Sequence, residues 1–120
     1  MKKILIVEDD ASIRELLVEI FESEGYYVDS STNGLDGIKS LENNLPDVIL
    51  MDVMMPVMNG YEFREEQLKH PLWNSIPVLV MSAQEQSNNK LAEYGLENFI
   101  RKPLELNHLL ETVREIASLH

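Results

Sequence analysis

The chain has 120 residues, 44% of them apolar, which is the size and composition of a single compact domain over residues 1–120. Its formal charge of -11, from 21 acidic and 10 basic residues, would repel a phosphate backbone and argues against direct binding of nucleic acid. The sequence has no cysteine, so disulfides and thiolate metal sites are excluded. No apolar run approaches the roughly 20 residues that cross a bilayer, and the amino end is too short for a secretory signal, so we expect a cytoplasmic protein without membrane insertion.

Short apolar runs alternate along the chain with stretches of helical period, which predicts five consecutive βα units and a parallel sheet. The strands are expected at 3–8, 26–30, 47–52, 76–82 and 97–101. The first helix is expected between the first two strands, and the others at 34–43, 60–70, 85–94 and 104–118. The second strand alternates apolar and polar side chains, which is typical of an edge strand.

The first and last helices have a clear apolar face. In the first helix, Gly25 is placed to end the helix, and the face consists of Ile13, Leu16, Leu17, Ile20 and Phe21. In the last helix, the predicted buried stripe consists of Leu106, Leu109, Leu110, Val113 and Ile116. Pro103 stands at a position where the first turn of this helix would accept proline.

The first strand ends in three consecutive acids, Glu8, Asp9 and Asp10. Asp10 is most simply explained as the cap of the helix that follows. Glu8 and Asp9 need another explanation, because adjacent carboxylates repel one another unless a cation or a base compensates them. A hard divalent ion such as Mg²⁺ prefers carboxylate and carbonyl oxygens, so these two acids indicate a cation site.

Asp52, directly after the apolar run 48–51, is the first candidate for chemistry. An acid at the carboxyl end of a buried strand points into the crevice where open α/β sheets bind their ligands. The long loop 53–60 follows, and loops of this kind carry function. The four methionines in 51–58 are interpreted as packing residues and not as a soft-metal site, because the neighbouring acids favour hard cations.

The fourth and fifth strands end in Ser82 and Lys102, which are expected at the same edge of the sheet. Singly, Ser82 would be a helix cap and Lys102 a solvated charge. Beside three carboxylates, a hydroxyl and an ammonium group together suit a phosphoryl group, which requires charge neutralisation on its oxygens and an oxygen nucleophile in line.

With these residues on these strands, the chain resembles a response-regulator receiver domain over essentially its full length. The resemblance implies that Asp52 is the phosphoacceptor. It also implies that Lys102 and Ser82 hold phosphoryl oxygens, helped by the backbone N–H groups of Met54 and Ala83.

The same resemblance implies a cofactor and a fold. Mg²⁺ would be bound by Asp9, by Asp52 and by the carbonyl of Met54, with Glu8 acting mostly through water. The fold would be flavodoxin-like α/β, with five parallel strands in the order 2-1-3-4-5 and helices on both faces. The Lys102–Pro103 bond is expected to be cis, as in relatives.

The resemblance further implies partners and a switch. The phosphodonor would be a sensor histidine kinase, a histidine phosphotransfer protein or a small donor such as acetyl phosphate. The output would be a downstream protein target, with a phosphorylation-linked homodimer as a further possibility. Ser82 and Phe99 would be the switch residues. No separate substrate turnover is expected beyond the chain's own phosphorylation and dephosphorylation.

Two features depart from the family pattern. Phe99 stands where tyrosine is commoner, so a switch there would rest on packing without a ring hydroxyl; the alternative is a plain core phenylalanine. The segment 84–96 is shorter than in relatives, so we expect a short or irregular fourth helix. This second departure leaves the output partner and the dimer geometry open.

Other classes of protein fit less well. An aspartyl phosphatase would place a second acid two residues after Asp52, where this chain has Met54. A flavin-binding flavodoxin shares the fold, but the acids 8–10 would repel its phosphate. A nucleotidase would need a Gly-rich loop with a lysine. The remaining alternative is a receiver-like protein-interaction module that acts without phosphorylation.

Overall fold

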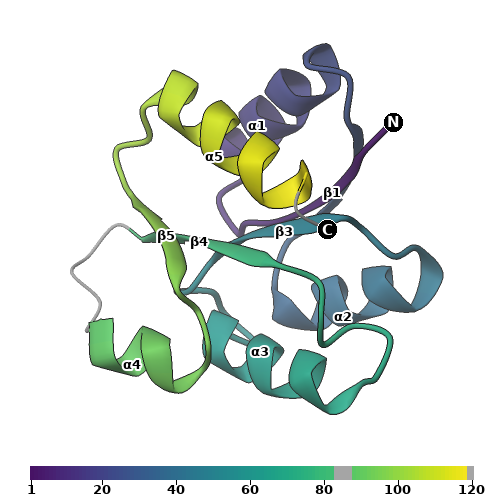
Figure 1. The fold of residues 1–120 in the computed structure, drawn as a ribbon, viewed down its shortest axis with the longest axis vertical. Coiled ribbons are helices and arrows are strands. Elements are labelled where there is room, and N and C mark those ends of the chain that lie inside the picture. Colours follow the sequence, from purple (N-terminus) through teal and green to yellow (C-terminus); the bar gives the residue numbers. More distant parts are fainter. Residues whose placement is uncertain (83–87, 119–120) are drawn as a thin grey trace.

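The computed structural model describes residues 1–82 and 88–118, with the backbone alone at residues 82, 88 and 89. Strands and helices alternate along the described chain (Figure 1). The strands are β1 (Lys3–Val7), β2 (Tyr27–Ser31), β3 (Val48–Asp52), β4 (Val78–Ser82) and β5 (Asn98–Arg101). The helices are α1 (Ala11–Ser23), α2 (Gly34–Asn43), α3 (Gly60–Lys69), α4 (Asn88–Glu93) and α5 (Leu106–Ser118). None of the helices in this described part is long and apolar enough to cross a membrane.

The five strands form one parallel sheet in the order β2-β1-β3-β4-β5, which confirms the predicted topology. β2 lies at one edge, as its alternating sequence predicted. Because all strands run in the same direction, their carboxyl ends meet at one edge of the sheet. The register places Asp52 beside Met81, and Ser82 beside Arg101.

Helices cover both faces of the sheet. In Figure 1, α1 and α5 lie on one face, and α2, α3 and α4 lie on the other. Successive residues of a strand point to opposite faces, so Ile4 and Ile6 belong to the core under α1 and α5, whereas Leu5 and Val7 belong to the core under α2, α3 and α4. Burial on both faces explains why the central strands are continuously apolar.

The beginning of α5 differs from the prediction. The helix begins at Leu106 and not at residue 104, because the Glu105 carboxylate caps it by accepting the backbone N–H groups of Asn107 (3.2 Å) and His108 (2.7 Å). Pro103 therefore lies ahead of the helix and not in its first turn. The Lys102–Pro103 peptide bond is cis, as expected.

The apolar faces of α1 and α5 are only partly buried. The buried members of the predicted α5 stripe are Leu109, Val113 and Ile116, with Leu110 half-buried. Leu106 was predicted to be buried and is 44% exposed. Leu16 of α1 is likewise 56% exposed. Both leucines border the space between the two helices, where no element of the described chain covers them.

The described part of α4 is Asn88–Glu93, so the expectation of a short or irregular fourth helix stays a prediction. The predicted range was 85–94, and its first part lies outside the described residues. Leu91 within the helix and Leu96 after it are buried in the core beside α3, which fixes the described part of this region on the sheet.

Candidate functional site

Glu8 is a buried acid at the end of β1. Its backbone N–H donates to the carbonyl of Ser31 (3.0 Å), and only 1% of the residue is exposed. One carboxylate oxygen accepts the backbone N–H of Asp10 (3.1 Å), and the other lies 3.1 Å from Nζ of Lys102. Burial raises the pKa of Glu8 above its usual value, although the Asp10 N–H group and Lys102 both act in the opposite direction.

The next two acids have different surroundings. Asp10 caps α1, since its side chain accepts the backbone N–H of Ile13 (3.1 Å), as predicted. Asp9 is exposed and lies between this cap and the buried Glu8. The cap therefore uses only one of the three consecutive acids.

Asp52 is the last residue of β3 and is 7% exposed. One of its carboxylate oxygens accepts the backbone N–H of Met54 (3.0 Å). The other lies 2.8 Å from Nζ of Lys102. The carboxylate is thus held in place at the carboxyl edge of the sheet, close to the surface.

Lys102 connects the two buried acids. It follows β5, and its ammonium group forms ion pairs with Asp52 (2.8 Å) and Glu8 (3.1 Å). Burial acts to lower the pKa of Lys102, but the hydrogen bonds that its ammonium group donates to Asp52 and Glu8 more than offset this, so that the pKa is raised. The lysine is therefore charged at neutral pH, and the strand ends of β1, β3 and β5 share one electrostatic cluster.

Glu8, Asp9 and Asp52 form a group that fits a divalent cation. Each offers a carboxylate oxygen, and the three oxygens lie within 4.8 Å of one another. One side of the group is exposed at Asp9, which leaves access for an ion and its water molecules. All of these donors are hard oxygen ligands, so the residues suit Mg²⁺ better than a soft metal.

Two backbone hydrogen bonds fix the β3–α3 loop beside Asp52. The backbone N–H of Gly60 donates to the carbonyl of Val53 (2.8 Å), and that of Gly34 to the carbonyl of Met58 (3.0 Å). A Cβ atom at Gly34 would lie 2.6 Å from that same carbonyl oxygen, so the contact requires glycine. Between these two ties, Val57 is 75% exposed and has a φ of 68°, a conformation that is strained for a β-branched residue.

The remaining predicted site residues are only partly described. Ser82 is the last residue of β4, next to Arg101 of β5, so its backbone reaches the expected edge. Ala83 lies outside the described residues. Phe99 is 36% exposed, and its ring lies 6.0 Å from the Arg101 guanidinium carbon. It is therefore not a core phenylalanine.

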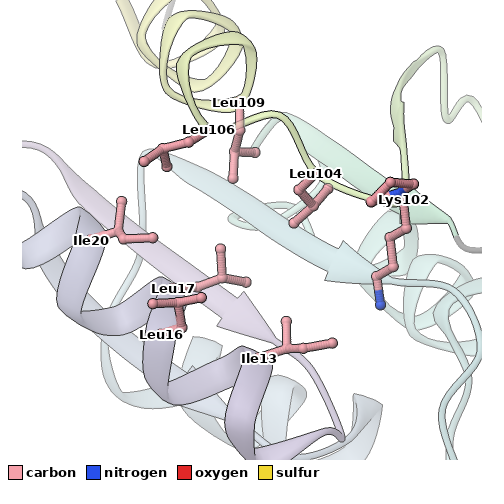
Figure 2. Close-up of a pocket in the computed structure, with 9 residues that line it drawn as sticks. Ile13, Leu16, Leu17, Ile20, Lys102, Leu104, Leu106 and Leu109 are labelled. Atoms are coloured by element: carbon pink, nitrogen blue, oxygen red, sulfur yellow. The ribbon is translucent and has the colours of Figure 1, made fainter.

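An apolar groove of about 730 Å³ opens next to the acidic cluster, between α1 and α5. Its lining residues are Ile13, Leu16, Leu17, Ile20, Lys102, Pro103, Leu104, Leu106 and Leu109. In Figure 2 the α1 side chains face Leu104, Leu106 and Leu109 across the groove, while Lys102 lies at one end with its nitrogen pointing away from α5. The groove and the acidic cluster therefore share Lys102.

Two features of the site were missed from the sequence. Arg14 of α1 donates to the carbonyls of Glu8 (2.9 Å) and Asp9 (3.5 Å), a contact with no signature in residue spacing. The groove was missed because Leu16 and Leu106 were assigned to buried faces. The helical spacing that identified those faces does not tell how far the neighbouring helix covers them.

Fold and site together define a class: a flavodoxin-like α/β protein with a half-buried lysine and three acids at the carboxyl edge of its sheet. The family model of the response regulator receiver domain matches residues 4–114. The chain therefore belongs to this family. Receiver domains are signalling modules of two-component systems, and they act with histidine kinases or phosphotransfer partners and bind Mg²⁺ at their acidic site.

Individual relatives agree with this assignment. The chain is 30% identical to Protein PilH of Pseudomonas aeruginosa, over 98% of this chain and 99% of that protein. It is 32% identical to Response regulator MprA of Mycobacterium sp. (strain KMS). That alignment covers 95% of this chain but only 50% of the relative. The signal receiver domain of a signal transduction histidine kinase from Syntrophus aciditrophicus has a TM-score of 0.89 at 32% identity, over 98% of this chain and 91% of that one.

Replacing Lys102 by methionine tests the electrostatic role of this residue. A carboxyl group whose pKa is higher in the folded than in the unfolded chain binds more protons when folded. Its contribution to stability is therefore lost as the pH rises from the unfolded-state pKa through the folded-state pKa. Lys102→Met raises the pKa of Glu8 further. We therefore expect it to lower the free energy of unfolding by about 3 kcal/mol near pH 8, and by less near pH 5.

Urea unfolding at the two pH values, in the presence of a chelator, measures the difference. Lys69→Met is the matched control, because that lysine is exposed and forms an ion pair with Glu66 at the surface (3.3 Å). The control should change stability by less than about 1 kcal/mol at both pH values. An equal loss for Lys102→Met at both pH values would contradict the role given to Lys102.

Proposed function

We propose that the chain is a phosphoacceptor receiver in which Asp52 takes a phosphoryl group from a histidine kinase, a histidine phosphotransfer protein or acetyl phosphate. The observation that supports this most strongly is the pairing of Asp52 with Lys102 (2.8 Å) next to Glu8 and Asp9. This arrangement offers an oxygen nucleophile at the carboxyl edge of the sheet, a cation for phosphoryl oxygens and a set of acids for a metal ion.

In the proposed reaction, a carboxylate oxygen of Asp52 attacks phosphorus of a phosphohistidine. The phosphorus–oxygen bond forms as the phosphorus–nitrogen bond breaks, and the leaving imidazole takes up a proton. The product is a mixed anhydride on Asp52. Lys102, already hydrogen-bonded to this carboxylate, would move to an oxygen of the new phosphoryl group, and Ser82 would hold another.

Mg²⁺ would be held by Asp9, Asp52 and the carbonyl of Met54, with Glu8 mostly acting through water. When bound, the ion would neutralise charge on the phosphoryl oxygens. The backbone N–H of Met54, which now donates to the Asp52 carboxylate, would become a donor to the phosphoryl group together with that of Ala83. The backbone geometry of the β3–α3 loop supports this role, because hydrogen bonds from Gly34 of α2 and from Gly60 of α3 fix two of the loop's carbonyl groups.

The phosphoryl group would act as a switch. It adds about -1.5 to -2 charge and three acceptor oxygens, which bias a two-state element. Ser82 and Phe99 are the proposed switch residues. Phe99 is exposed and its ring lies 6.0 Å from the Arg101 guanidinium carbon, so the ring has room to change its packing without losing a hydrogen bond. The output would be a changed docking face for a downstream protein or for a second copy of the chain.

The groove between α1 and α5 is the proposed contact surface for the protein phosphodonor. A donor must place its phosphohistidine against Asp52, so the surface next to the acidic cluster is covered in the complex. Leu16 and Leu106 are exposed there, 56% and 44% respectively, and the groove ends at Lys102. An apolar groove of this kind suits an amphipathic helix of the donor.

The first prediction concerns the acceptor. After incubation with acetyl phosphate and Mg²⁺, intact mass spectrometry should show a single phosphoryl adduct on the wild-type chain. The adduct should be absent from Asp52→Asn and after removal of Mg²⁺ with a chelator. A folded, Mg²⁺-binding chain that forms no adduct with either acetyl phosphate or a phosphorylated kinase would favour the alternative, a receiver-like interaction module that acts without phosphorylation.

The second prediction separates the docking groove from the chemistry. The double variant Leu16→Ala/Leu106→Ala should slow phosphotransfer from a histidine kinase by about tenfold, since two exposed apolar contacts are lost. Phosphorylation by acetyl phosphate should be unchanged, because a small donor does not use the groove. Both rates follow from the appearance of the phosphorylated chain in time courses.

Leu72→Ala is the matched control, because Leu72 is 65% exposed and lies in the α3–β4 loop at the opposite edge of the sheet. The control should leave both rates unchanged. Equal slowing of the kinase and acetyl phosphate reactions in the double variant would place these leucines in the fold or the chemistry and contradict their role in docking.

A further inference from the structure

Arg14 reaches back from α1 to the loop that contains the metal-binding acids. Its Nη1 donates to the carbonyl of Glu8 (2.9 Å) and, over a longer distance, to the carbonyl of Asp9 (3.5 Å). The residue is half-buried, and within the described part of the chain its guanidinium group donates to backbone oxygens and not to carboxylates. The guanidinium group therefore acts on the course of the loop and not directly on the acids.

The contacts of Arg14 define both peptide units around Asp9. The Glu8 carbonyl belongs to the peptide unit before Asp9, and Arg14 holds it. The Asp9 carbonyl and the Asp10 N–H belong to the peptide unit after it and point in opposite directions, because the unit is planar and trans. Arg14 contacts this unit on one side, and the Glu8 carboxylate accepts its N–H group (3.1 Å) on the other.

With both flanking peptide planes held, the φ and ψ angles of Asp9 are restricted, and so is the direction of the Cα–Cβ bond from which its carboxylate extends. Asp9 needs this support more than its neighbours do. Glu8 and Asp52 are oriented by Lys102 and by backbone N–H groups, whereas Asp9 is exposed. Its carboxylate nevertheless lies within 4.8 Å of the other two.

We infer that Arg14 is a positioning residue for the cation site, which holds the backbone of Asp9 so that its carboxylate faces the site before Mg²⁺ binds. This inference rests on the proposed function, because it assigns a role toward the same metal ion. Residues that orient metal ligands typically change affinity by about 10- to 100-fold when they are replaced.

The direction in which Mg²⁺ affinity changes when Arg14 is replaced distinguishes a positioning role from a purely electrostatic one. Arg14→Met removes a positive charge close to the acids, and by charge alone this would strengthen the binding of a cation. Loss of positioning weakens binding instead. Arg14→Lys keeps the charge but replaces the planar guanidinium with a single ammonium group, so it should support the two carbonyls less well than arginine does.

The test is isothermal titration calorimetry of Mg²⁺ into the unphosphorylated chain. The dissociation constant should rise about tenfold in Arg14→Met, and Arg14→Lys should lie between this variant and the wild type. Lys2→Met, which removes an exposed charge ahead of β1 at the opposite edge of the sheet, should match the wild type. Circular dichroism with a chelator establishes that each variant is folded.

Unchanged or tighter Mg²⁺ binding by Arg14→Met would overturn the role of Arg14 while leaving the proposed function intact. If that variant does not fold, the comparison of Arg14→Lys with the wild type decides, and equal affinities would overturn the inference. A wild-type chain that bound no Mg²⁺ would contradict the cation site of the proposed function, and the role of Arg14 with it.

Discussion

The site depends on the two ion pairs of Lys102, with Glu8 at 3.1 Å and Asp52 at 2.8 Å. Glu8 is almost fully buried, and a second carboxylate beside it would be strongly unfavourable without a cation to compensate both. The lysine supplies that cation from the end of β5, although β1 and β5 are not neighbours in the sheet. The strand order therefore determines the chemistry, because it brings three residues that are distant in the sequence to one edge.

Lys102 neutralises only part of the negative charge of the acidic cluster, and the charge that remains is the basis of the function we propose. A single ammonium group faces three carboxylates, so the site retains an excess of negative charge toward solvent, where Asp9 is exposed. A divalent cation would balance that excess, and a phosphoryl group on Asp52 would then find both the ion and Lys102 beside it. The same fixed backbone that holds the acids, through Arg14 and the β3–α3 loop, means that little rearrangement is needed when these ligands bind.

Most of the fold and the centre of the site could be predicted from the sequence, for a physical reason. Strands buried on both faces are continuously apolar, so their ends are visible, and the polar residue that follows each one falls at the ligand-binding edge. Glu8, Asp52 and Lys102 were found in this way. The sequence was less informative where burial or a hydrogen bond depends on how elements pack together. The helical period could not show that Leu106 is exposed, and no residue spacing indicates that Arg14 donates to a loop carbonyl.

The proposed phosphoacceptor role of Asp52 is tested most directly by identifying the phosphorylated residue. Borohydride reduces an aspartyl phosphate to homoserine, so reduction of the phosphorylated chain followed by peptide sequencing by mass spectrometry locates the acceptor. We predict homoserine at position 52 alone, because the Asp52 carboxylate is the one held between Lys102 and the backbone N–H of Met54. Homoserine at position 9 or 10 would contradict it, since the acids assigned to metal binding and helix capping would then be doing the chemistry.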